Sequence, residues 1–349
     1  MIHAVFLASL GAISAALLWW GVKTLPHEDR QILASVPRGK HAHGGWKGMN
    51  LTYYGLITAT ANALAVALVV VLMTAAGVDL RATAGGAILL LAVCLPAARL
   101  VAYLVEGKKH TFTVAGAMFV GLIAAPIIFS AINLLPRFGV NVHVPLLPAL
   151  AAIGVGYAFG EGLGRLACLS FGCCYGKPVD ECGPLARRLF RNRFLVFSGH
   201  TKKIAYEGNL AGRRVAPIQV VTSLVLTATA IAGAAMYLAG HPGAAFFTAL
   251  LVTQAWRLFS ETLRADYRGG GKVSAYQIMS VVGIGVALAL AVLLPAESRT
   301  VDLAAGVRAL WSPTMILFLQ GLWIVTFLYT GRSMVTEATL SFHVCKDRI

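Results

Sequence analysis

Nine apolar stretches, each approaching the ~20 residues that cross a bilayer as a helix, dominate this sequence of 349 residues. Inside a membrane every backbone polar group must find an internal partner, which leaves helices as the natural solution. The sequence therefore predicts an all-α integral membrane protein, a polytopic bundle of about nine transmembrane helices. The stretches run over 3–22, 54–76, 86–106, 113–135, 146–167, 217–239, 243–263, 274–294 and 309–330.

Basic residues are shared unevenly between the two ends of this predicted bundle. The odd-numbered loops and the C-terminus lie on one side and carry 22 of the 29 Lys and Arg, whereas the other side carries four. Cytoplasmic loops are the ones enriched in Lys and Arg, so the charges predict that the basic side faces the cytoplasm. That side includes the long segment 168–216, and beside nine spans its basic run does not indicate a nucleic-acid partner.

Five charged residues fall inside apolar stretches, where a charge at mid-bilayer costs roughly 2.5–3.5 kcal/mol. Glu161 and Arg165 are four residues apart, as are Arg257 and Glu261, and Arg99 lies in a third stretch. Side chains four apart share one helical face, so we expect each Glu to pair with the Arg of its own helix. The set is cationic overall and predicts a site for an anionic group within the membrane.

Six cysteines do not form the pattern of a disulfide framework. Packing or loop bracing is the main interpretation of Cys173 and Cys174, with covalent catalysis and metal binding as alternatives. A metal site with Cys168, Cys182 and His200 would lack the paired C-x2-C spacing of zinc sites. We therefore predict neither a metal nor a cofactor.

Several runs, in order along the chain, resemble the prolipoprotein diacylglyceryl transferase family across most of residues 50–295. The run from Phe159 to Cys168 resembles the family's Phe-Gly-x-Gly-x-Gly-Arg signature and places its essential arginine on Arg165. The other similar runs are Tyr54-Gly55-Leu56, Ala97-Ala98-Arg99, Ala216-Pro217-Ile218-Gln219, Arg257 to Asp266, and Ser274 to Ser280.

The sequence also departs from the family pattern. Ala115 stands where the family has a histidine that is important for activity, and the nearest histidine is His110. Cys168, Phe171 and Cys173 replace the asparagines and the glutamate of the signature. The family places its head segment outside the cytoplasm, whereas the charges place residues 168–216 inside.

The resemblance implies a membrane-embedded transferase that binds an anionic phospholipid similar to phosphatidylglycerol through an arginine cluster. It would transfer the diacylglyceryl group to an acceptor, a thiol of a lipoprotein precursor or another nucleophile, and release glycerol phosphate. The alternatives are an inactive homologue that binds lipid or assists assembly, and an anionic-lipid transporter. The expected catalytic residues are Arg165, Arg257, Glu261, Glu161 and Tyr54, and the expected substrate-binding residues are Arg99, Arg264, Gln219, Cys168, Tyr175, Gly176 and Asp266.

We expect three parts in this chain, within a bacterial cytoplasmic (inner) membrane. Residues 1–53 would be an added N-terminal transmembrane anchor and basic linker. Residues 54–294 would be a seven-helix transferase-like core with the extramembrane head segment 168–216. Residues 295–349 would add one transmembrane helix and a tail.

Overall fold

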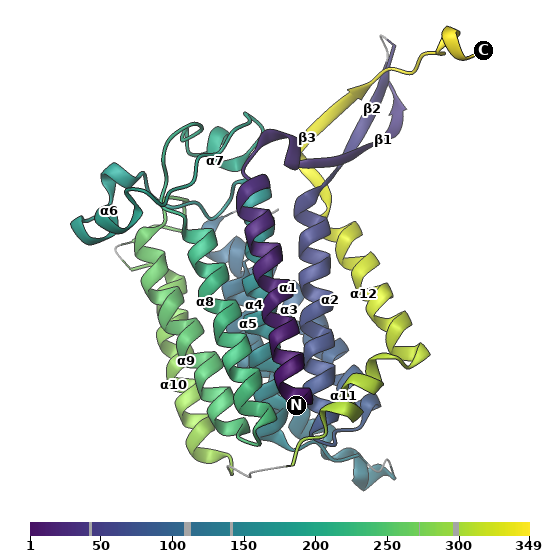
Figure 1. Ribbon diagram of the computed structural model, residues 1–349. Helices are drawn as coiled ribbons and strands as arrows, with labels where there is room; N and C mark the ends of the chain where they lie inside the picture. Colours follow the sequence, from purple (N-terminus) through teal and green to yellow (C-terminus); the bar gives the residue numbers. More distant parts are fainter. Residues whose placement is uncertain (42–43, 108–112, 140–141, 272, 296–299) are drawn as a thin grey trace.

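Nine long helices lie side by side in the computed structural model, which describes residues 1–41, 44–107, 113–139, 142–271, 273–295 and 300–349 (Figure 1). Within these ranges the long helices are α1 (Ile2–Thr24), α2 (Tyr53–Ala75), α3 (Leu80–Glu106), α4 (Val114–Ile132), α5 (Leu146–Phe171), α8 (Ile218–Leu238), α9 (Pro242–Ser260), α10 (Ala275–Leu293) and α12 (Pro313–Thr330). The shorter helices are α6 (Pro184–Phe190), α7 (Lys203–Tyr206) and α11 (Leu303–Leu310).

Eight of the long helices are apolar and long enough to cross a membrane, which confirms a polytopic helical membrane protein. α9 has 19 residues but is not among the eight. Its Gln254 and Arg257 lower its hydropathy, and both are buried, with 1% and 9% of their surface exposed. α9 therefore carries polar side chains into the bundle instead of presenting a uniformly apolar surface.

α5 is the central helix, and its glycines bring its neighbours close. A Cβ added at Gly160 would lie 2.7 Å from Cβ of Ala65 on α2, and one added at Gly162 would lie 2.6 Å from Oγ1 of Thr227 on α8. Small residues let helix backbones approach closely in membranes, where packing replaces the hydrophobic effect as the main attraction. The glycines of this run thus fix α5 between α2 and α8, without unwinding it.

A three-stranded antiparallel sheet corrects the prediction of a purely helical chain. β1 (Ile32–Lys40) and β2 (Trp46–Thr52) come from the expected basic linker, and β3 (Arg332–Leu340) comes from the expected tail. The strand order is β1-β2-β3, with Val36 opposite Met49 and Gly48 opposite Ala338. Apolar and polar residues alternate only weakly along the sequence of these strands. In addition, the pairing of β2 with β3 joins segments almost 300 residues apart, so local sequence patterns did not predict the sheet.

The sheet, the head segment and the C-terminus lie at one end of the bundle, and the N-terminus lies at the other (Figure 1). The head segment packs through Tyr175, Phe197 and Ile204 onto Leu25, which follows α1, and Leu169 of α5. Gln31 and Thr201 exchange two hydrogen bonds of 2.9 and 2.7 Å between the same two regions. α1 and its connection therefore support the head segment, although both precede the expected core.

Lys202 is a buried cation at this junction, with none of its surface exposed. Its Nζ donates hydrogen bonds to the carbonyl oxygens of Leu25, at 3.1 Å, and Ser170, at 2.5 Å. It thereby connects the C-terminal ends of α1 and α5. Burial lowers the pKa of Lys202 from its usual 10.5 to about 8.

We predict that Lys202→Ala destabilises the protein by about 1–3 kcal/mol, because two buried carbonyl groups lose their donor. The folded state binds the lysine proton more weakly than the unfolded chain does, so protonation costs stability below pH 8. That cost falls as the pH rises from 8 to 10.5, and the advantage of the wild type should grow across this window. Denaturant unfolding in mixed micelles measures both effects. Lys177→Ala is the control, and an advantage that shrinks with rising pH would contradict this account.

Candidate functional site

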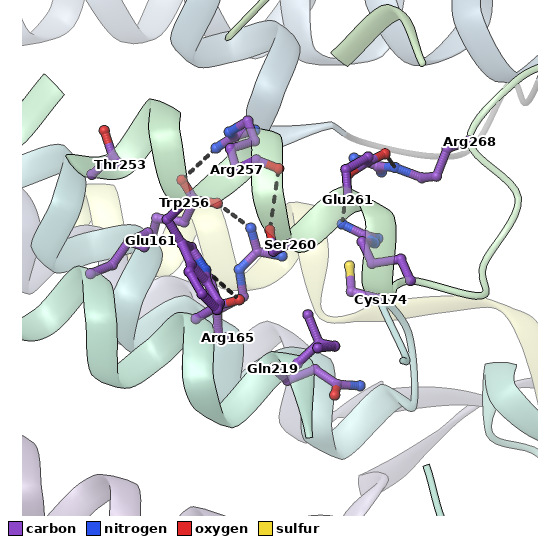
Figure 2. Close-up of a pocket in the computed structure, with 14 residues that line it drawn as sticks. Glu161, Arg165, Cys174, Gln219, Thr253, Trp256, Arg257, Ser260, Glu261 and Arg268 are labelled. Carbon is purple, nitrogen blue, oxygen red and sulfur yellow. Dashed lines mark hydrogen bonds and ion pairs between the residues drawn. The ribbon is translucent and has the colours of Figure 1, made fainter. Parts of the chain in front are cut away.

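A narrow polar pocket lies between α5, α8 and α9, towards the end of the bundle that carries the head segment (Figure 2). The pocket and the open solvent at its mouth together contain about 410 Å³ of space not filled by atoms. It is lined by Glu161 and Arg165 of α5; Cys174; Ile218, Gln219, Thr222 and Leu226 of α8; Thr253, Trp256, Arg257 and Ser260 of α9; and Glu261, Arg264 and Arg268 of the segment that follows. The sequence-predicted residues Glu161, Arg165, Gln219, Arg257, Glu261 and Arg264 meet here.

Glu161 is the centre of this pocket, because its carboxylate is shared between two helices. Arg165 donates to Oε1 and the Tyr157 hydroxyl donates to Oε2. Arg257 reaches across from α9, and its Nη2 donates to Glu161 Oε2 at 2.6 Å and to the Tyr157 oxygen at 2.7 Å. One carboxylate therefore holds two guanidinium groups at a depth where their charges need a partner.

The expected pairing of Glu161 with Arg165 is confirmed, and that of Arg257 with Glu261 is wrong. α9 ends at Ser260, and Glu261–Leu263 form a 3-10 turn. Four-residue spacing brings side chains together only along a continuous α-helix, and the tighter turn directs Glu261 elsewhere. Glu261 instead accepts from Nε of Arg268 at 3.0 Å, with Arg264 3.9 Å away.

Arg268 belongs to a second ionic network that closes the head-side end of the pocket. Its Nη1 lies 3.3 Å from Oε1 of Glu106 at the end of α3, and the Tyr276 hydroxyl donates to the same oxygen at 2.7 Å. The Arg268 guanidinium also lies 4.0 Å from the centroid of the Tyr276 ring. This network connects α3, the segment after α9, and the start of α10.

Arg264 and Asp266 form a two-pronged pair beside the pocket. Nε and Nη2 of Arg264 donate to the two carboxylate oxygens of Asp266 at 2.8 and 2.6 Å. Burial lowers the pKa of Arg264, but the charge and hydrogen bonds of Asp266 together with the charges of Cys174 and Glu261 hold this pKa well above its usual value. Planar pairs of this kind fix the orientation of the guanidinium.

Three polar atoms at the pocket remain without a hydrogen-bond partner among the described residues. They are Nε of Arg165, Nε of Arg257 and Oε1 of Gln219, whose Nε2 donates to the backbone oxygen of Cys173 at 2.9 Å. A buried N–H group without a partner is costly and rare in native structures. The two arginine N–H groups therefore keep unused hydrogen-bonding capacity.

The other predicted site residues do not line this pocket. Arg99 projects from α3 towards α12, and its guanidinium lies 4.3 Å from the centroid of Tyr329, so a single cluster of Arg99 with Arg165 and Arg257 does not form. Tyr54 stands at the start of α2 with its ring centroid 5.7 Å from that of Phe171. It therefore lies near the end of α5 that leads into the head segment.

Four further predicted residues lie around the pocket. Tyr175 is buried in the core of the head segment, and burial raises its pKa to about 12. Gly176 forms a β-bridge with Arg264, and a Cβ there would lie 2.4 Å from the carbonyl oxygen of Ala216. Asp266 orients Arg264, and Cys168 lies in the last turn of α5 with its sulfur 3.8 Å from that of Cys174.

Sequence reasoning missed three contributors, namely Tyr157, Arg268 and Trp256. Tyr157 precedes Glu161 by four residues, so helical spacing could have found it. Arg268 lies in a glycine-rich loop, where spacing carries no information about contacts. Trp256 donates from Nε1 to Oγ1 of Thr222 at 3.0 Å, a contact between α9 and α8 that only the fold brings about.

The fold and the pocket together define a polytopic membrane protein with a polar pocket between its helices. Comparison with known families identifies it further: the prolipoprotein diacylglyceryl transferase family matches residues 44–293, and the chain belongs to this family. No curated protein matches the sequence significantly. The chain is thus a diacylglyceryl transferase of this family, in which membership implies transfer from phosphatidylglycerol to prolipoprotein.

We predict that Glu161→Ala destabilises the protein by about 3–5 kcal/mol, because removing one partner of a buried ionic group leaves uncompensated charge. Glu181→Ala is the matched control: Glu181 pairs with Arg213 at 3.2 Å on the surface, and its loss should cost about 0–1 kcal/mol. Unfolding in mixed micelles measures both variants. Similar losses in the two variants would show that Glu161 does not hold the pocket together.

Proposed function

We propose that the pocket binds the phosphate of phosphatidylglycerol, and that Arg165 and Arg257 stabilise the charge that develops on the departing glycerol phosphate. The observation that carries this proposal is the pair of buried, unpartnered Nε–H groups on these two arginines. Donors held in place before the reaction, aimed where charge develops, are worth about 10²–10³ in rate each.

The hydrogen-bond donors of the lining support an anionic ligand. Four arginines line the pocket together with Glu161 and Glu261, while two further carboxylates, Asp266 and Glu106, pair with Arg264 and Arg268. Both lining carboxylates already accept from arginines, so they orient donors in the pocket. The pocket therefore suits the phosphate-binding half of the reaction.

In the proposed reaction the acceptor thiol loses its proton, and its sulfur attacks the glyceryl carbon that bears the phosphate oxygen. The carbon–oxygen bond breaks, the electron pair leaves on glycerol phosphate, and a thioether forms. The acceptor is a cysteine of prolipoprotein, as the family implies. Ala115 is buried on α4, where the family resemblance places a histidine, so another group must activate the thiol in this chain.

Turnover of phosphatidylglycerol with a labelled headgroup tests the proposal, with purified protein and a precursor peptide that contains one cysteine. We expect labelled glycerol phosphate and lipid-modified peptide from the wild type. Arg165→Ala and Arg257→Ala should each lower turnover about 10²-fold or more, through loss of a positioned donor. Lysine at either position should restore only part of it, because Lys lacks the planar fork.

Arg99→Ala provides the discriminating control, because Arg99 is also an arginine of an apolar helix but lies outside the pocket lining. We expect this variant to keep turnover within a few-fold of the wild type. A loss of turnover as large as that of Arg257→Ala would show that Arg99 also contributes to the phosphate site. Absence of turnover with any anionic phospholipid would overturn the proposed reaction.

We further propose that the protein resides in the bacterial cytoplasmic membrane, with its head segment on the cytoplasmic side. The basis is the excess of Lys and Arg at the end of the bundle with the head segment and the C-terminus (Figure 1). Fusion at the exposed C-terminal Ile349 reports this side without disturbing the core. Green fluorescent protein at this position should fluoresce, and alkaline phosphatase should be inactive. The reverse result would show that the orientation implied by the family overrides the charge bias.

A further inference from the structure

A cluster of three thiols lies directly beside the arginine pocket. The sulfur atoms of Cys168, Cys173 and Cys174 all lie within 4.8 Å of one another. All six cysteines of the chain are free thiols, and Cys174 itself lines the pocket. We propose that these three cysteines form a zinc site with an open fourth position towards the pocket.

The backbone turn after α5 brings the three sulfurs together. Gly172 ends the helix with φ 71°, and the backbone N–H groups of Gly172 and Cys173 both donate to the carbonyl oxygen of Cys168, at 2.8 and 3.2 Å. Cys174 then has φ 55°, a left-handed conformation that among the described non-glycine residues only Asn209 shares. Such a conformation costs free energy in a residue with a Cβ and is concentrated at functional sites. Here it turns two consecutive cysteines back over the last turn of the helix.

The distances suit tetrahedral coordination. A zinc–sulfur bond of about 2.3 Å places neighbouring sulfurs of a tetrahedron about 3.8 Å apart. Cys168 and Cys174 already have this separation, 3.8 Å. The remaining separations, up to 4.8 Å, require only small side-chain movements. The C-x4-C-C spacing lacks a C-x2-C pair, but the left-handed turn produces the required geometry.

The surrounding charges favour three thiolates with a divalent ion. Coordination releases one proton from each thiol to solvent, and the resulting site carries one net negative charge. Arg165 and Arg264 line the pocket with Cys174, and a guanidinium group near a thiol favours its thiolate form. A zinc site with three protein ligands is the open type, in which the fourth position takes water or a substrate.

The fourth position is suited to the acceptor thiol, an extension that rests on the proposed transferase function. A thiol bound to zinc is deprotonated. Because Ala115 stands where the family has a histidine and the pocket carboxylates bind arginines, the zinc ion would supply this activation of the acceptor thiol. The phosphate of the donor would then bind at the arginines, and the acceptor sulfur would bind at the metal that Cys174 helps to hold, on the other side of the same pocket.

Cobalt substitution tests the metal site independently of turnover. The full-length protein, purified with reductant and freed of metal by a chelator, is titrated with Co²⁺. We expect one equivalent to give thiolate charge-transfer absorption and the d–d bands of a tetrahedral ion, both removed by Zn²⁺. This wild-type spectrum does not depend on the folding of any variant. Absence of these bands would overturn the zinc site, as would six-coordinate bands alone.

Serine variants assign the ligands. Cys168→Ser, Cys173→Ser and Cys174→Ser should each weaken cobalt binding at least about 10-fold, in line with the loss of a direct ligand. The double variant Cys94→Ser/Cys345→Ser should bind like the wild type. Equal binding by all variants would overturn the assignment. Thiol titration of unreduced, denatured protein should find six thiols, and four would indicate a disulfide in place of the metal site.

The acceptor peptide separates the two parts of the inference. A peptide with its cysteine should shift the cobalt bands, and the same peptide with serine should not. An unshifted spectrum would overturn acceptor binding at the metal. If the cobalt bands form but no lipid turns over, the transferase proposal fails while the metal site stands. If the serine variants lose the metal site but turn over lipid as the wild type does, the metal has no part in the reaction, and the proposed role of the arginines is unaffected.

Discussion

The sharing of one carboxylate between two helices is the interaction on which the pocket depends. Glu161 holds Arg165 on its own helix and Arg257 on α9, with Tyr157 as a further donor. Two buried arginines side by side would repel each other and lack solvation, so burying either guanidinium group without this carboxylate would be strongly unfavourable. α5 can play this part because glycines bring α2 and α8 close while its polar side chains point towards α9.

Helical periodicity predicted the parts of this site that lie within one continuous helix. Glu161 and Arg165 are four apart on α5 and pair as expected, and apolar length predicted the bundle itself. Prediction failed where an element ended or where distant segments met. Glu261 follows the end of α9 and pairs with Arg268, whereas β2 pairs with a strand almost 300 residues later. Arg99 shows a third limit, because a charge in an apolar helix indicates a partner without telling which face of the bundle supplies it.

The family resemblance covers the arginine side of the pocket, whereas the residues expected on the acceptor side differ in this chain. The arginines expected from the resemblance at positions 165 and 257 meet in the structure. In the family resemblance, Cys168 and Cys173 stand in place of polar residues of the signature, and Ala115 stands in place of its histidine. These changes are not scattered, because two of them fall in the three-thiol cluster next to Arg165. The proposed metal site would supply the activation of the thiol for which the resemblance expects the histidine.

The unpartnered arginine donors of the pocket would favour the products of the proposed reaction over the bound donor. Phosphatidylglycerol carries one negative charge on its phosphate, whereas departing glycerol phosphate is a monoester that carries about −1.5 to −2 near pH 7. Four arginines line the pocket, and the carboxylates of Glu161, Glu261, Asp266 and Glu106 pair with them, so their formal charges balance. Only interactions that strengthen as the reaction proceeds raise its rate, and a positioned donor that meets the charge of the leaving group satisfies this condition. Glu161 and Glu261 are therefore as important as the arginines, because they hold the guanidinium groups in place while Nε of Arg165 and Nε of Arg257 keep their hydrogen-bonding capacity.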